Sequence, residues 1–175
     1  MSSVSKAIFL VGFMGCGKST LGLGLAKALG FEFIDLDKFI ENRNFKSISE
    51  IFEKYGEEGF RERECKALKE VCEFSNVVIA TGGGVPCFGD NMNLMNSSGM
   101  VVFIDIPISE LVRRLIKSKT SRPIIKDLNE RELMRVAESK LAERRPFYEQ
   151  AQIVIRHINP SVEMLVSVIN ETCQR

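Results

Sequence analysis

The chain has 175 residues and a formal net charge of +1 at pH 7. This length is typical of one domain with a sizeable core, and the balanced charge argues against a dedicated nucleic-acid binder. The first apolar run, residues 7–11, is too short for a signal peptide or a membrane span. We therefore expect a single cytoplasmic domain over residues 1–175 that acts on small molecules, with no nucleic-acid or membrane partner. A monomer is the expected oligomeric state, although none of these features indicates it.

The cysteines give no sign of a metal site or a disulfide framework. They are Cys16, Cys65, Cys72, Cys87 and Cys173. Their number is odd, no C-x-x-C pair occurs, and the only histidine, His157, completes no metal-ligand spacing. This pattern is typical of free thiols in a reducing compartment.

A glycine-rich motif follows the first predicted strand. Residues 12–19 read G-F-M-G-C-G-K-S, between the apolar run 7–11 and a helical pattern over 20–29. This is G-x-x-x-x-G-K-[ST] between a strand and a helix, in which backbone N–H groups and the helix N-terminus surround a phosphate chain. Lys18 would add a cation, and the Ser19 hydroxyl could ligate Mg²⁺. The alternative is a glycine-rich turn that binds nothing.

Apolar runs alternate with helical patterns along the whole chain. The expected strands cover residues 7–11, 32–35, 77–81, 100–106 and 153–156. This alternation predicts a three-layer α/β/α fold with a five-stranded parallel sheet and helices on both faces. Because ligands of such sheets bind beyond the carboxyl ends of the strands, the residues at those ends should lie along one edge. They are Gly12, Asp35, Gly82 and Asp105.

Two carboxylates close the second predicted strand, in the sequence D-L-D at 35–37. Because alternate residues of a strand point to the same side, Asp35 and Asp37 should converge beside the phosphate loop. One could hold Mg²⁺ through water while the other accepts a hydroxyl proton. The alternative is that Asp37 caps the following helix.

An insertion of about residues 37–72 interrupts the alternation before the third strand. Ser47 and Glu50 have capping-box spacing and open a helix that Gly56 can close, and a second helix follows from about Glu57. Such an insertion is a candidate substrate-binding element. A third motif, T-G-G-G at 81–84, requires either a tight turn or a close approach of the backbone to a ligand.

Arginines form the last group of candidate residues. Arg61 lies in the inserted helices, and Arg144 lies late in a long helix that Asn129 and Glu132 should cap. Arginine grips a carboxylate through two parallel hydrogen bonds, although most single arginines are solvated surface residues. The polar, basic segment 117–126 around Arg122 could be a lid over the phosphates, or a solvated connector.

Taken together, these motifs resemble the shikimate kinase family, within the P-loop kinases that phosphorylate small molecules. The resemblance covers nearly the whole chain, in the family's order and close to its spacing. The matching motifs are G-F-M-G-C-G-K-S at 12–19, D-L-D at 35–37, F-R-E-R-E at 60–64, T-G-G-G at 81–84, R-P at 122–123 and R-R-P-F-Y at 144–148. The glycine loop alone occurs in many unrelated proteins, whereas the ordered set is specific.

The resemblance implies an ATP site with Mg²⁺. The nucleotide-binding residues it implies are Gly15, Cys16, Gly17, Lys18, Ser19, Thr20, Arg114, Arg122, Asn159 and Pro160. Ser19 and Asp35 would hold Mg²⁺, and Lys18 and Arg122 would contact the transferred phosphate. Arg114 would pack on the adenine, with the loop Asn159–Pro160 on its other side.

The resemblance also implies a shikimate site. Its residues would be Asp37, Arg61, Gly82, Gly83, Gly84 and Arg144. Arg61 and Arg144 would clamp the shikimate carboxylate, with Glu64 orienting Arg61. The glycine backbone would line the ring, and Asp37 would contact the hydroxyl groups and act as the base.

Two positions depart from the family pattern. Cys16 stands where a small hydroxyl residue or alanine is commoner, and it is either a reactive thiol or a buried, inert one. The second departure is expected in the length of the segment between Arg114 and Arg122, and it bears on the adenine contacts.

The expected reaction is transfer of the γ-phosphoryl group of ATP to the 3-hydroxyl of shikimate, giving shikimate 3-phosphate and ADP in aromatic amino-acid biosynthesis. Lys18, Arg122 and Mg²⁺ would supply most of the rate by positioning and charge neutralisation. Two alternatives stay open. One is a related small-molecule kinase, such as one acting on gluconate, and the other is a nucleotide-binding module without catalysis.

Overall fold

The computed structural model describes residues 7–117 and 129–174. Five parallel strands form one sheet in the order β2-β3-β1-β4-β5. The strands are β1 (Ala7–Val11), β2 (Glu32–Asp35), β3 (Val77–Ala80), β4 (Gly99–Asp105) and β5 (Ile153–Arg156). The predicted α/β fold is confirmed. Two predicted strand ends move slightly, because β3 stops before Thr81 and β4 stops before Ile106.

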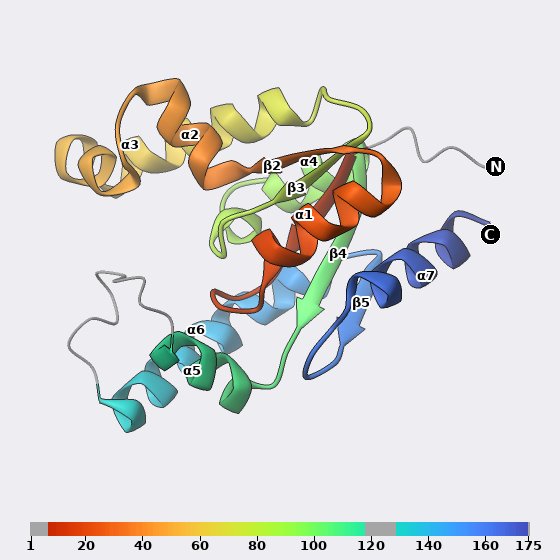
Figure 1. Ribbon diagram of the computed structural model, residues 1–175. Coiled ribbons are helices and arrows are strands. Elements are labelled where there is room, and N and C mark those ends of the chain that lie inside the picture. The colour runs from red at the N-terminus through yellow and green to blue at the C-terminus, as the bar shows by residue number, and fades with distance from the viewer. Residues whose placement is uncertain (1–6, 118–128, 175) are drawn as a thin grey trace.

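Helices cover the sheet (Figure 1). They are α1 (Lys18–Leu29), α2 (Leu36–Asn44), α3 (Ile48–Val71), the short 3₁₀ helix η1 (Val85–Cys87), α4 (Asn91–Ser98), α5 (Ile108–Lys117), α6 (Glu130–Tyr148) and α7 (Val162–Cys173). Helix α1 lies beside α7, although the two are far apart in the chain, and packs on β3, whereas α4 packs on β4 and contacts α3 (Figure 1). The pairs α2–α3 and α5–α6 lie at two different ends of the molecule.

The centre of the core is β1, which is paired on both sides. Every residue from Ala7 to Val11 is 0% exposed. Ile8, for example, lies opposite Val78 of β3 and Met100 of β4. A continuous apolar run is what a parallel strand covered on both faces requires. Burial of each large aliphatic side chain contributes about 1.5–3 kcal/mol to the stability of the fold. The strand is therefore held firmly in place, and so is the start of the loop that follows it.

The inserted helices meet at a kink, as the sequence predicts. Gly56 has φ 68° and ψ −174°, and this left-handed, extended backbone breaks α3 into two parts. Ser47 and Glu50 form the expected capping box at the start of α3. The part of α3 after Gly56 carries Arg61 and Glu64 toward the carboxyl edge of the sheet.

The predicted lid over residues 117–126 lies outside the described residues, apart from Lys117, and so does Arg122. After this gap, Asn129 and Glu132 form the predicted capping box at the start of α6. No helix in the part of the chain that the structure describes is long and apolar enough to cross a membrane.

Candidate active site

The loop between β1 and α1 has the form of a phosphate-binding site. Gly17, just before α1, has φ 95°, a left-handed conformation that glycine adopts without strain. The ammonium group of Lys18 donates hydrogen bonds to the backbone oxygens of Gly12, at 2.7 Å, and Phe13, at 3.0 Å. A cation and a helix N-terminus therefore meet at one point, which favours an anionic ligand.

A cavity of about 420 Å³ opens above this loop. Its lining residues come from the phosphate loop, the D-L-D motif, the glycine turn and α5. They are Met14, Gly15, Gly17, Lys18, Ser19, Thr20, Asp35, Asp37, Thr81, Gly82, Gly83, Arg114 and Leu115. Three motifs that are far apart in the sequence thus line one cavity at the carboxyl edge of the sheet, where the sequence places them.

The local structure of the two aspartates differs from the prediction. Strand β2 ends at Asp35 and α2 begins at Leu36, so Asp37 lies in the first turn of a helix and not on a strand. Asp35 and Asp37 therefore do not alternate along a strand, and that prediction is wrong. The helix cap is also Asp35, not Asp37, because its carboxylate accepts a hydrogen bond from the Lys38 backbone N–H. Both carboxylates still face the same cavity.

The environment of Asp37 is set by the glycine turn. A β-carbon added to Gly82 would lie 3.0 Å from Oδ1 of Asp37, so the absence of a side chain at Gly82 leaves room for this carboxylate. Asp37 is exposed to solvent in the open cavity. An acceptor hydroxyl group between the phosphate loop and the glycine turn would therefore meet a carboxylate.

The two oxygen groups that the sequence assigns to Mg²⁺ are in contact. The Ser19 hydroxyl donates a hydrogen bond of 2.7 Å to Oδ2 of Asp35. A hydroxyl and a carboxylate at this spacing, beside a phosphate site, are hard oxygen ligands that suit Mg²⁺, which keeps several waters and uses few protein ligands. The residues present therefore fit the ion.

Two arginines, one from α3 and one from α6, lie against the glycine turn, next to the cavity but not among the residues that line it. A β-carbon added to Gly83 would lie 3.3 Å from Nη1 of Arg144, and one added to Gly84 would lie 3.1 Å from Nη1 of Arg61. Any side chain at these two glycines would push the guanidinium groups away. The close approach explains the glycines better than a tight turn alone does, and it places two cations against neighbouring residues of one turn.

Two further side chains hold this arrangement in place. The Tyr148 hydroxyl donates a 2.5 Å hydrogen bond to the backbone oxygen of Gly83, and burial raises the pKa of Tyr148, so the hydroxyl keeps its proton. Glu64, only 2% exposed, accepts a 2.7 Å hydrogen bond from Nη1 of Arg61. Burial raises the pKa of Glu64, and Arg61 opposes that shift.

Arg114 lies at the other end of the cavity. Its Nε donates to Glu110 at 2.6 Å, and its Nη2 donates to the backbone oxygen of Ile158 at 3.0 Å. Nη2 also donates to Oδ1 of Asn159 at 3.4 Å, and the next residue, Pro160, is buried. The residues that the sequence assigns to the adenine thus come together beside the phosphate loop.

Glu110 should make stability depend on pH in acid. Hydrogen bonds from Arg113 and Arg114 lower the pKa of Glu110 from 4.5 to about 2. A lowered carboxyl pKa stabilises the fold fully above the unfolded pKa, and this contribution is lost as the pH falls toward the folded value. We expect wild type to exceed Glu110→Gln in unfolding free energy by a constant amount above about pH 5, and this difference should shrink toward pH 2.

Urea unfolding of both proteins between pH 2 and 6 measures this difference. The same substitution at the exposed Glu62 is the matched control. A difference between wild type and Glu110→Gln that stays constant across this range would show that the Glu110 carboxylate does not carry the pH dependence.

The sequence leaves open whether the Cys16 thiol is reactive or is buried and inert. Its burial in the structure favours the inert thiol. Cys16 is 0% exposed, whereas Cys65, Cys87 and Cys173 are partly exposed. We expect a thiol reagent to label these three cysteines well before Cys16 in the native protein. Peptide mapping by mass spectrometry after brief labelling measures the order. First labelling at Cys16, with protection by ATP, would restore the reactive interpretation.

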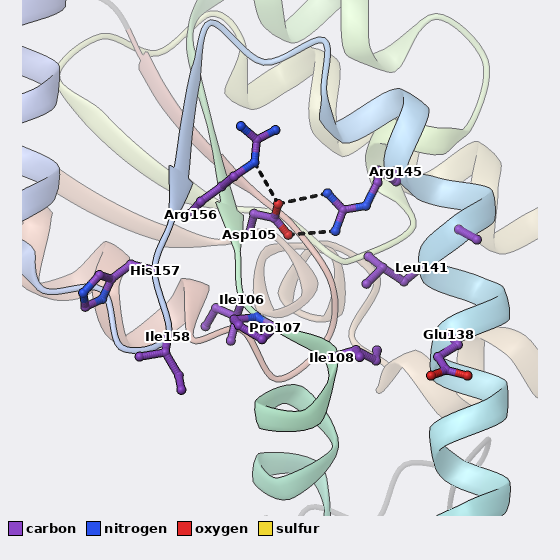
Figure 2. A pocket seen from close by; sticks show the side chains of 11 residues that line it. Asp105, Ile106, Pro107, Ile108, Glu138, Leu141, Arg145, Arg156, His157 and Ile158 are labelled. Carbon is purple, nitrogen blue, oxygen red and sulfur yellow. Dashed lines mark hydrogen bonds and ion pairs between the residues drawn. The ribbon is translucent and has the colours of Figure 1, made fainter.

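A larger cavity, of about 570 Å³, lies between the end of β4, α6 and the segment after β5 (Figure 2). Asp105 was expected at the ligand edge, but its carboxylate faces this second cavity. It accepts hydrogen bonds of 2.9 and 3.0 Å from Arg145 and forms an ion pair of 3.4 Å with Arg156. Figure 2 shows both arginines pointing toward Asp105. These charges join β4, β5 and α6 to one another.

Several residues of the candidate site are not predicted from the sequence. Met14 and Leu115 line the phosphate cavity, but their apolar side chains look like ordinary core residues in the sequence. Tyr148 belongs to the motif R-R-P-F-Y at 144–148, but the sequence predicts no role for it. Phe88 lies under the Arg61 guanidinium, with Cζ 3.6 Å from the ring centre, and no motif includes it.

Comparisons with known proteins agree on one family. The family model described as shikimate kinase matches residues 14–174. The shikimate kinase of Parabacteroides distasonis is 49% identical over 148 residues, which are 85% of this chain and 86% of that protein.

Solved structures give the same result. The crystal structure of shikimate kinase from Bacteroides thetaiotaomicron superposes with a TM-score of 0.90 at 44% identity, covering 97% of this chain and 99% of that one. Shikimate kinase from Acinetobacter baumannii in complex with shikimate superposes with a TM-score of 0.83 at 35% identity, covering 97% of this chain and 93% of that one.

Proposed function

The chain belongs to the shikimate kinase family, and from this premise we propose that it transfers the γ-phosphoryl group of ATP to the 3-hydroxyl of shikimate in the cavity above the phosphate loop. The observation that carries this proposal is the pair of guanidinium groups, Arg61 and Arg144, against one glycine turn beside Asp37. A relative of known structure binds shikimate, which is a carboxylate with three hydroxyl groups.

On the acceptor side, the carboxylate of shikimate lies between Arg61 and Arg144. Two planar guanidinium groups can offer several parallel N–H donors to a carboxylate, which fixes its orientation as well as its position. Glu64 keeps Arg61 in place from below. With the carboxylate held there, the ring lies on the backbone of Gly82 to Gly84, and a hydroxyl group reaches Asp37.

On the nucleotide side, the backbone N–H groups of residues 15–20 and the Lys18 ammonium bind the phosphates of ATP. Ser19 and Asp35 would hold Mg²⁺, which when bound would neutralise phosphate charge. Arg114 and the loop Asn159–Pro160 hold the adenine between them. Arg122, outside the described residues, is the arginine that the sequence predicts to reach the transferred phosphate.

The chemical step needs one proton acceptor and concentrated positive charge. Asp37 takes the proton of the acceptor hydroxyl group while the oxygen of that hydroxyl group forms a bond to the γ-phosphorus. The bond from this phosphorus to the bridging oxygen of ADP breaks, and Lys18 stabilises the charge that develops there. The rigid turn and loop bring the two substrates into line, so positioning supplies much of the rate.

We also propose a cytoplasmic monomer. All five cysteines are free, which suits a reducing compartment. The phosphate loop, the aspartates and the arginines of the candidate site all come from one chain, so no residue of a second copy is needed to complete the described part of the site.

The carboxylate clamp can be tested by replacing Arg144 with lysine. A point charge then replaces a planar fork, which costs about 1.5–3 kcal/mol for a charge-assisted contact. We expect the KM for shikimate to rise by about 10- to 150-fold, because each 1.4 kcal/mol is a factor of ten. The KM for ATP should barely change. Steady-state kinetics with each substrate varied in turn measure both constants.

The matched control is Arg135→Lys, the same substitution at an exposed position of α6. It should leave both KM values unchanged. A loss of ATP binding in Arg144→Lys with unaltered shikimate binding would place Arg144 at the wrong end of the site.

A further inference from the structure

Arg61 is held between an aromatic ring and a glycine. Its guanidinium carbon lies 3.6 Å from the centre of the Phe88 ring, which is the distance of direct stacking. A β-carbon added to Gly84 would lie 3.1 Å from Nη1 and 3.2 Å from Nη2 of Arg61. Gly84 and Phe88 flank the short helix η1. This one turn of chain therefore supplies both the space for the Arg61 guanidinium, at Gly84, and the ring that stacks on it, at Phe88.

The polar contacts of Arg61 leave its orientation incompletely fixed. Nη1 donates to the buried Glu64 at 2.7 Å, but Nη2 lies 3.5 Å from Glu57, a carboxylate that is 66% exposed. Nε is buried and has no hydrogen-bond partner among the residues that the structure describes. A planar group anchored strongly at one nitrogen can still rotate about that contact, so the plane must be fixed by packing.

The ring of Phe88 supplies that packing. A guanidinium group stacks on an aromatic face through cation–π attraction, and the stacked geometry restricts it to one plane. The other nearby ring, Phe60, is 5.1 Å away and only 5% exposed, and it stacks with Phe52 as part of the core. Phe88 is 37% exposed, so a smaller or polar side chain would be tolerated there if only packing into the core mattered.

We propose that Phe88 is a positioning residue for acceptor binding: its ring holds the Arg61 guanidinium in the plane from which Nη2 reaches the carboxylate of the acceptor. Phe88 acts through Arg61 and need not touch the substrate. This inference rests on the proposed function, because it takes the carboxylate of shikimate as the partner of Arg61. Its effect is therefore confined to the affinity for the acceptor.

Three substitutions at Phe88 separate the effect of the aromatic face from the effect of the side-chain volume. Phe88→Ala removes both, Phe88→Leu keeps apolar volume without an aromatic face, and Phe88→Trp keeps the face. We expect the KM for shikimate to rise by about 3- to 30-fold in Phe88→Ala, the range that cation–π energies give. Phe88→Leu should show most of this rise, and Phe88→Trp should return close to wild type. In all three variants, kcat and the KM for ATP should stay within about twofold of the wild-type values, which is less than the change that loss of the stacking energy would give.

The control is Phe45→Ala, because Phe45 is 93% exposed at the turn between α2 and α3. It should leave the KM for shikimate unchanged. A double-mutant cycle gives the decisive comparison, since Phe88→Ala in an Arg61→Ala background should add no further loss if the ring acts through Arg61.

Several results would overturn the inference. They are an unchanged KM in Phe88→Ala, equal losses in the leucine and tryptophan variants, and a full additional loss in the Arg61→Ala background. Thermal unfolding of each variant identifies an unfolded protein, and Phe88→Trp and Phe88→Leu still decide the question if Phe88→Ala fails to fold. If wild type does not phosphorylate shikimate at all, the proposed function fails. If wild type does and the Phe88 variants match it, only this inference fails.

Discussion

Replacing Asp37 with asparagine lowers kcat for shikimate by about 10²- to 10⁴-fold, the loss typical of a working general base. The amide keeps the shape and much of the hydrogen bonding of the carboxylate beside Gly82, but it cannot accept the hydroxyl proton. We expect the variant to fold and to bind both substrates. Steady-state turnover, together with calorimetric titration of shikimate, separates the loss of chemistry from a loss of binding.

The matched control for Asp37 is Glu53→Gln, an equivalent loss of a carboxylate at an exposed position of α3. It should turn over like wild type. Near-normal turnover in Asp37→Asn would limit Asp37 to positioning the acceptor, and the proton would need another route.

The second large effect is expected at Lys18. Lys18→Met keeps the apolar stem and removes the ammonium group that contacts the Gly12 and Phe13 backbone oxygens. Losing one preorganised charge donor at the transferred phosphate lowers kcat by about 10²- to 10³-fold. The KM for shikimate should change much less, because the arginines that we propose to bind its carboxylate lie on α3 and α6. Initial rates at saturating ATP and shikimate measure the effect on kcat.

Lys27→Met serves as the control for Lys18→Met. Lys27 lies in the last turn of the same helix and is exposed. This variant should keep its activity and report any general effect of removing a lysine from α1. Turnover in Lys18→Met equal to that of Lys27→Met would remove Lys18 from the phosphate-transfer step.

The predictions that succeed depend on local sequence signals that the fold does not override. The strand–loop–helix at residues 7–29 and the kink at Gly56 follow from apolar runs, glycines and caps, and the structure has them where the sequence predicts. The two aspartates show the limit. The prediction that both lie at the sheet edge is right. The chain turns into a helix after Asp35 and does not continue as a strand, because Asp35 caps that helix through the Lys38 backbone N–H.

Contacts between distant segments could not be predicted in the same way. Glu110 and Ile158 fix Arg114 through hydrogen bonds that depend on how α5 packs beside the segment after β5. Phe88 meets Arg61 only because η1 follows the glycine turn at a particular angle. No spacing in the sequence indicates either pairing, since a lone exposed phenylalanine or a glutamate on a helix is common in any protein.

The choice of acceptor shows whether this chain phosphorylates shikimate. ADP release from ATP and Mg²⁺ should be measured with shikimate, quinate, gluconate or no acceptor in parallel, with Arg144→Lys in the same series. We expect rapid ADP release only when shikimate is the acceptor, a strong reduction in Arg144→Lys at low shikimate, and formation of shikimate 3-phosphate. Faster release with gluconate than with shikimate, or equal release without any acceptor, would show that shikimate is not the substrate.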